Sequence, residues 1–196
     1  MSQNTSSAVM QQRSEPHNSL DFFPTPPWAT RALIEHVLKD SVSGRSCWEP
    51  ACGEGHMVRP LAEYFARVVG TDVHPYGYGD IVDFLFPHPS RGADWIITNP
   101  PFRLAQQFIS QARQKAREGV AMLVRTSFLE GGARYRELFS INPPSVIAQF
   151  AERVPMVKGR YDPDASTATS YCWLVWSHEV PCRAQLERLP ADVRAA

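Results

Sequence analysis

The chain has 196 residues, of which 43% are hydrophobic and 11% aromatic, and this suits one globular domain with a sizeable core. Its 20 Lys and Arg balance 20 Asp and Glu, so the overall charge favours neither a nucleic acid nor a membrane surface as partner. The four cysteines lack paired CxxC spacing, which predicts no zinc site. We find no signal peptide and no apolar run of transmembrane length, so we expect a cytoplasmic protein without a membrane partner.

Three segments differ in composition. Residues 1–18 are rich in Ser, Gln and Asn and lack apolar periodicity, which predicts a mobile N-terminal tail. Residues 19–180 carry all the predicted elements and are expected to form a single folded domain. Residues 181–196 are expected to be a C-terminal extension.

The predicted elements alternate between helix and strand. The first helix follows Thr25, its expected N-cap, has proline in its first turn, and runs to about Lys39. In chain order there follow strand 46–50, a Gly53–Gly55 turn, helix 57–65, strand 67–73, a short strand ending near 83, strand 94–98, helix 104–116, strand 120–126, helix 134–140, and strands 145–150 and 171–176. This alternation predicts an α/β fold with a mostly parallel seven-stranded sheet covered on both faces. The loop 153–169 is too short for a crossover helix, so we expect a terminal antiparallel strand pair.

The first strand–turn–helix unit predicts a ligand site. Gly53 and Gly55 would let the backbone approach a ligand at a helix N-terminus, and Asp72 ends the next strand, where a carboxylate can hold ribose hydroxyls. Val58 stands where a dinucleotide fingerprint has its third glycine, and no Walker lysine is present. A nucleoside without a pyrophosphate therefore suits this turn better than a dinucleotide.

The stretch "WIITNPPF" ends a predicted strand on Asn99, two prolines and Phe102. These residues would lie over the ligand crevice, where the prolines hold the Asn99 amide and a backbone carbonyl rigidly outward. Two acceptors beside an aromatic ring match an exocyclic amino group on a stacked heterocycle. The tripeptide Asn-Pro-Pro occurs a second time at residues 142–144, where it follows a predicted helix and precedes Ser145. We therefore interpret this second copy as a turn that ends the helix.

The order of these motifs resembles that of the S-adenosylmethionine-dependent amino-methyltransferases, specifically the N6-adenine DNA type of small bacterial and phage enzymes, in the γ arrangement. The matching segments are "FPTP" at 23–26, "EPACGEG" at 49–55, "DVHP" at 72–75, "DFL" at 83–85 and "NPPF" at 99–102. The resemblance covers about residues 20–177. It implies a single-domain Rossmann-like class I methyltransferase fold, with 19–180 as the catalytic domain, S-adenosylmethionine as cofactor and adenine-containing DNA as substrate.

The resemblance also implies roles for individual residues. Those expected to bind or shape the cofactor site are Phe23, Thr25, Glu49, Ala51, Gly53, Gly55, Asp72, Asp83 and Phe84. Within this set, the first five lie at the methionine end, Gly55 shapes the turn, Asp72 takes the ribose, and Asp83 and Phe84 take the adenine. The catalytic tetrapeptide is Asn99, Pro100, Pro101 and Phe102. In it, Asn99 and the Pro100 carbonyl would hold the target amine while Phe102 stacks on the flipped base.

The chain departs from the family in one respect. Sequence-specific members usually add a target-recognition domain, for which this chain has no room, so DNA is expected to be contacted by loops 129–136 and 153–169. The second loop carries Arg153, Lys158, Arg160 and Tyr161, which suit phosphate contact and stacking. We therefore expect weak sequence specificity, or dependence on a specificity partner or a homodimer.

Several alternatives stay open. The same tetrapeptide can hold adenine in RNA or the side-chain amide of glutamine in a protein. A dinucleotide oxidoreductase is the rival with another cofactor, and an inert binding module that keeps the cofactor fold is the rival without catalysis.

Overall fold

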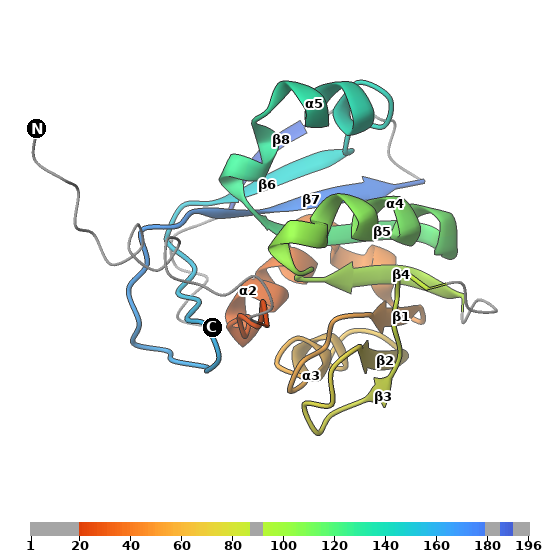
Figure 1. Cartoon of the computed structure of the whole chain (residues 1–196). Helices are drawn as coiled ribbons and strands as arrows, with labels where there is room; N and C mark the ends of the chain where they lie inside the picture. The colour runs from red at the N-terminus through yellow and green to blue at the C-terminus, as the bar shows by residue number, and fades with distance from the viewer. Residues whose placement is uncertain (1–19, 87–91, 179–184, 190–196) are drawn as a thin grey trace, which may run out of the picture.

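The computed structural model describes residues 20–86, 92–178 and 185–189 (Figure 1), and the expected tail at 1–18 lies outside them. A single sheet of eight strands forms the centre of the molecule, in the order β3-β2-β1-β4-β5-β7-β6-β8. The strands are β1 (Ser46–Glu49), β2 (Arg67–Asp72), β3 (Asp80–Ile81), β4 (Ala93–Thr98), β5 (Ala116–Arg125), β6 (Val146–Phe150), β7 (Tyr171–Ser177) and β8 (Gln185–Leu189).

The sheet confirms the predicted fold class. Strand β7 runs antiparallel to both β5 and β6, and all the other pairings are parallel. All seven predicted strands are present, including the antiparallel pair β6 and β7. The sheet has one further strand, β8, which lies in the expected C-terminal extension and pairs in parallel with β6.

The helical segments are short and several depart from α-helical geometry. They are α2 (Pro27–Ala32), the π-helical η1 (Leu33–Leu38), the 3-10 turn η2 (Lys39–Val42), α3 (Val58–Leu61), the 3-10 turn η3 (Phe102–Leu104), α4 (Ala105–Lys115), the 3-10 turn η4 (Thr126–Leu129), α5 (Gly132–Arg134) and the π-helical η5 (Tyr135–Phe139). Within the described ranges, no helix combines the length and apolarity needed to cross a bilayer.

The predicted N-cap of the first helix is wrong. Helix α2 starts at Pro27, and its N-cap is Pro26, which offers no side-chain hydrogen bond. Proline at the first helical position explains this start, because its fixed φ suits the helix and its missing N–H needs no partner there. Thr25 is instead buried, and its hydroxyl faces Asn99.

Helices cover both faces of the sheet, and alternate residues of each strand enter different cores. On β4, Trp95 and Ile97 pack with α2, η1 and α3, whereas Ile96 packs on the opposite face with α4. Side chains of a strand point alternately to its two faces, so an uninterrupted apolar run can serve both cores. Because β1, β2 and β4 are parallel neighbours, their carboxyl ends meet at one edge. Glu49, Asp72 and Asn99 are brought together at that edge.

Candidate active site

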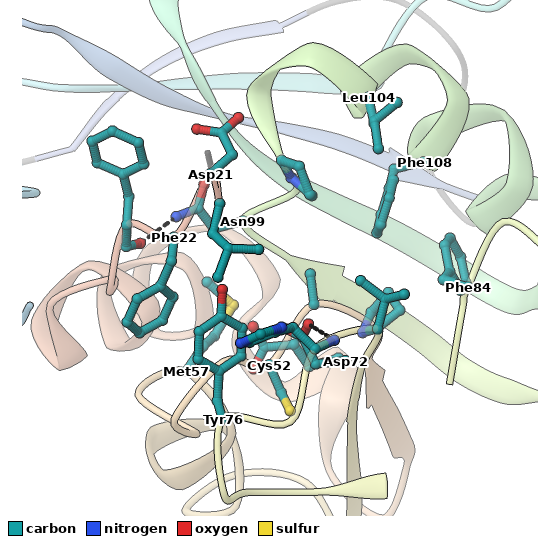
Figure 2. Close-up of a pocket in the computed structure, with 18 of the residues that line it drawn as sticks. Asp21, Phe22, Cys52, Met57, Asp72, Tyr76, Phe84, Asn99, Leu104 and Phe108 are labelled. Atoms are coloured by element: carbon teal, nitrogen blue, oxygen red, sulfur yellow. Dashed lines mark hydrogen bonds between the residues drawn. The ribbon is translucent and has the colours of Figure 1, made fainter. Parts of the chain in front are cut away.

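A cleft of about 250 Å³ lies over the carboxyl ends of β1, β2 and β4. In Figure 2, Asn99 and Asp72 lie on opposite sides of it, and Leu104 and Phe108 of the η3–α4 segment form part of its wall. Of the predicted cofactor residues, the cleft is lined by Phe23, Thr25, Glu49, Ala51, Asp72, Asp83 and Phe84. This set comes from four separate segments of the chain, so the tertiary fold brings the cleft together.

The Gly53 turn is tied to the end of β2 by Asp72. The Gly53 N–H donates to Asp72 Oδ2 at 2.9 Å, and the His74 N–H donates to Asp72 Oδ1 at 2.9 Å. Gly53 has φ of 51°, and a Cβ there would lie 2.4 Å from the Phe22 ring, so only glycine suits this position. Gly53 and Gly55 shape the turn behind the cleft but do not line it. The cleft wall from this turn is formed by Ala51, Cys52 and their neighbours.

Glu49 places a buried carboxyl group at the floor of the cleft. Its side chain is 2% exposed, and among the described residues Oε2 has no hydrogen-bond partner. Burial, together with the nearby charge of Asp72, raises the pKa of the Glu49 carboxyl well above its ordinary value. An unpaired buried carboxyl group in a ligand cleft favours a ligand that brings a positive charge or a hydrogen-bond donor.

The opposite end of the cleft is apolar. Phe84 is 2% exposed and contacts Trp48 and Phe108, with ring centroids 5.1 Å and 5.0 Å away. Asp83 accepts a hydrogen bond from the Leu85 N–H at 2.9 Å, which turns the chain around Phe84. Phe84 is therefore both a core residue and a wall of the cleft, and this end suits the flat ring of a nucleobase.

Asn99 is held so that its carbonyl oxygen remains free. Nδ2 donates to the Phe23 carbonyl oxygen at 2.9 Å and to Thr25 Oγ1 at 3.1 Å, and it lies 3.6 Å from Met156 Sδ. Because a backbone carbonyl can only accept, the nitrogen must face Phe23, and this sets the orientation of the amide. Asn99 Oδ1 is buried and has no hydrogen-bond partner among the described residues. A free acceptor is thereby held at the cleft.

Phe102 lies beside the cleft rather than in its wall. Its N–H donates to Asp21 Oδ2 at 2.6 Å, and its ring centroid lies 5.0 Å from that of Phe23. The Arg125 guanidinium carbon is 3.9 Å from the Phe102 ring centroid, in the geometry of a cation–π contact. Of the tetrapeptide, Asn99 and Pro101 line the cleft, whereas Pro100 does not. The tetrapeptide thus presents an amide to the cleft and an aromatic ring to its outer side.

Residues 20–25 form a strap across the site that sequence reasoning missed apart from Phe23 and Thr25. Asp21 contacts the tetrapeptide, and the Phe22 ring stacks on Tyr76 at 4.5 Å. The Phe22 carbonyl accepts a hydrogen bond from the Gly159 N–H at 2.9 Å. These contacts join residues from 54 to 137 positions apart, so no local pattern in the sequence could reveal them. Further cleft residues that were not predicted include Cys52, His56, Met57, His74 and Leu104.

The predicted substrate residues of loop 153–169 do not line the cleft. Arg153 donates to Ser170 Oγ, and Arg160 pairs with Asp162 at 3.1 Å. The Tyr161 ring lies 5.2 Å from that of His56, a cleft residue, so the loop reaches the rim of the site through this pair. Among the described residues no group of His, Cys, Asp or Glu is arranged to hold a metal ion.

Comparison with known proteins supports a methyltransferase fold. No family model matches the chain. A Type II methyltransferase of Thermus thermophilus, M.TthHB8I, is 31% identical over 94 residues, in an alignment that covers 43% of this chain and 22% of that protein. The chain therefore matches only about a fifth of the length of this relative.

Solved structures match most of the chain at low sequence identity. A modification subunit of a proposed type I restriction enzyme from Vibrio vulnificus has a TM-score of 0.63 at 17% identity, covering 94% of this chain and 51% of that one. A proposed class I S-adenosylmethionine-dependent methyltransferase of Listeria monocytogenes has a TM-score of 0.61 at 14% identity, covering 92% of this chain and 69% of that one. A proposed RNA methyltransferase of Pyrococcus horikoshii has a TM-score of 0.59 at 16% identity, covering 87% of this chain and 96% of that one.

These matches support the resemblance to S-adenosylmethionine-dependent methyltransferases seen in the motifs, without testing the N6-adenine type or the γ arrangement. The sequence similarity is to a Type II methyltransferase, and the structural similarity to the Vibrio vulnificus subunit covers 94% of this chain. The chain has the Rossmann-like fold of the class I S-adenosylmethionine-dependent methyltransferases.

Proposed function

We propose that this protein transfers a methyl group from S-adenosylmethionine to the N6 amino group of adenine in DNA. The observation that carries the proposal is the Asn99 amide, whose nitrogen is tied to Phe23 and Thr25 while its oxygen is buried at the cleft without a partner. An amino group that donates to this oxygen would satisfy it. The similarity to M.TthHB8I and to a restriction-modification subunit supports DNA as the substrate.

The cleft residues fit S-adenosylmethionine from end to end. Glu49 would meet the ammonium group of the methionine part, because its buried carboxyl lacks a partner. Asp72 is held by two backbone N–H groups and keeps lone pairs for the ribose hydroxyls. The apolar end around Phe84 and Phe108 suits the adenine ring, with Asp83 beside it. When bound, the cofactor supplies a sulfonium methyl group that is open to displacement by a nucleophile.

The residues of the tetrapeptide would orient the nucleophile. Asn99 Oδ1 is the free acceptor at the cleft and would accept from one N–H bond of an amino group. The resemblance assigns the second N–H bond to the Pro100 carbonyl, although Pro100 is not among the residues that line the cleft, and the prolines hold this segment rigidly. As the amine nitrogen gains positive charge in the transition state, its N–H groups donate more strongly, so these acceptors stabilise the transition state more than the ground state. Phe102 supplies an aromatic face for the flipped base. Positioning and exclusion of water then supply most of the rate.

Weak sequence specificity is part of the proposal, because the basic residues of loop 153–169 suit phosphate contacts and phosphates carry no base sequence. The same hypothesis includes a specificity partner, or a second copy of the chain, that would help to select the DNA site.

The test is transfer of a labelled methyl group to duplex DNA, single-stranded DNA, RNA and a glutamine-containing peptide, with the product identified by mass spectrometry. We expect N6-methyladenine in DNA. Asn99→Ala should lower turnover by about 100-fold or more, the usual cost of losing one preorganised polar partner of the transition state. Asn142→Ala, in the second Asn-Pro-Pro, should retain activity and controls for damage to a turn. Methylation of RNA or of the peptide in preference to DNA would overturn the substrate assignment.

A further inference from the structure

A second concave surface begins at the outer side of the tetrapeptide. It is a groove of about 610 Å³ between α4 and the η4–η5 region, which are neighbours in Figure 1. Phe102, just before α4, lines this groove, and so does Leu85, which also lines the cofactor cleft. The groove therefore starts where the proposed target base would stack and leads away along α4. We call it the amide groove, after the side chains described next.

One face of the η3–α4 segment lines the amide groove with Arg103, Gln106, Gln107, Ser110, Gln111 and Gln114. These positions recur every three or four residues, and the opposite face of α4 is buried in the core. A solvated helix face usually carries mostly charged residues, whereas this one carries four glutamines. Each glutamine amide offers both donors and an acceptor, the combination that reads the edges of bases.

The opposite wall holds an arginine in a set position. Arg134 Nη1 donates to the carbonyl oxygens of Phe128 and Glu130 at 2.7 and 2.6 Å, and the guanidinium lies 4.2 Å from the Phe128 ring centroid. Arginine has five N–H donors, so these two bonds leave others for an anion. The acidic residue of the groove, Glu137, accepts a hydrogen bond from Gln106 Nε2 at 3.0 Å. The wall thus combines a preorganised cation with hydrogen-bonding side chains.

We propose that the amide groove holds the nucleotides next to the flipped adenine, with the exposed Gln107 and Gln114 contacting base edges and Arg134 facing a phosphate. This proposal rests on the proposed function, because it uses Phe102 as the stacking point of the target base. It adds α4 and α5 to the DNA contacts proposed for loop 153–169, which lies near His56 at the rim of the cofactor cleft. Any sequence preference would then arise from the glutamines.

The test adds charge to the amide groove. The double variant Gln107→Glu with Gln114→Glu changes the formal charge by two units at exposed positions. Ser43→Glu with Arg67→Gln makes the same change at exposed positions next to the amino ends of β1 and β2, at the opposite edge of the sheet. Binding of a fluorescent single-stranded DNA of mixed sequence, and of its duplex, is measured at low salt. Affinity for S-adenosylhomocysteine is measured alongside.

We expect the groove variant to bind DNA about tenfold or more weakly than the control variant, because acidic groups placed against phosphates oppose binding. Both variants should bind S-adenosylhomocysteine like the wild type. Gln107→Ala with Gln114→Ala should change the distribution of methylated sites in a DNA of random sequence. If the two charged variants bind DNA equally well and the distribution of methylated sites is unchanged, the amide groove does not hold DNA, and the proposed function remains intact. A wild type that neither binds nor methylates DNA would overturn both.

Discussion

The Asp72 carboxylate accepts a hydrogen bond from the Gly53 N–H at 2.9 Å, and so ties the end of β2 to the turn that follows β1. Asp72 therefore has two tasks: it holds the turn in the shape that only glycine permits, and it presents oxygen atoms to the cleft. A residue that shapes a ligand site and is also proposed to contact the ligand should be difficult to replace, even by a close analogue.

We predict that Asp72→Ala weakens the binding of S-adenosylhomocysteine by about 1–3 kcal/mol, the usual cost of losing charge-assisted hydrogen bonds. Asp72→Asn should also weaken it, because an amide has one acceptor oxygen whereas the two backbone N–H groups use both oxygens of Asp72. Calorimetry measures both affinities, with Asp40→Ala as an exposed control. Unchanged affinity in Asp72→Ala would rule out the role at the ribose.

Glu49 should make the stability of the empty protein depend on pH. Its folded-state pKa is raised well above 4.5 by burial and by Asp72. The folded protein then binds a proton more tightly than the unfolded chain, so stability is full below the unfolded pKa and is lost as pH rises through the folded pKa. Glu49→Gln, which carries no titrating group, should melt at a higher temperature than the wild type at neutral pH, and the difference should shrink toward pH 4.

The same variant should bind S-adenosylhomocysteine less tightly, because an amide cannot pair with an ammonium group as a carboxylate does. Melting curves from pH 4 to pH 8 and calorimetry at neutral pH provide the two readouts. A melting difference that does not change with pH would show that the Glu49 carboxyl does not titrate as expected. Wild-type affinity in Glu49→Gln would show that the carboxyl does not meet the cofactor.

Phe102 should affect substrate binding without affecting the cofactor, since its ring lies outside the cleft. Phe102→Ala is expected to weaken productive DNA binding by about 1–3 kcal/mol, the usual value for stacking of a base on an aromatic side chain. Phe102→Tyr keeps the aromatic face and should restore most of the activity. The KM for DNA and the affinity for S-adenosylhomocysteine are measured for both variants. A loss of cofactor affinity equal to the loss of DNA binding would point to structural damage instead.

The basic residues of loop 153–169 should make DNA binding depend on salt concentration. Replacing Lys158 and Arg160 with Ala should reduce the slope of log K against log salt for DNA binding by roughly 1–2 units. The Arg160–Asp162 pair does not prevent this, because the Arg160 side chain is 69% exposed and such pairs are weak. Fluorescence anisotropy over a range of salt concentrations measures the slope. An unchanged slope would show that Lys158 and Arg160 do not contact phosphates.

Much of this protein is determined by local sequence patterns. Alternating helical and strand periodicity predicted the seven strands from β1 to β7, because side-chain burial repeats with the period of each element. The ends of those strands located Asp72 and Asn99 at one edge, since parallel strands bring their carboxyl ends together. Strand β8 escaped prediction, because a short strand at the edge of a sheet depends on its pairing partner more than on its own pattern.

The tertiary structure alone decided how the site is completed. Asn99 presents its oxygen because Phe23 and Thr25, more than 70 positions earlier, hold its nitrogen. Arg125 faces Phe102 because neighbouring strands carry them to the same edge of the sheet. The free acceptor of Asn99 and the unpaired carboxyl of Glu49 exist only once distant segments exclude water from them. A sequence specifies which groups can donate or accept, but whether a buried group finds a partner depends on contacts between segments that no local periodicity encodes.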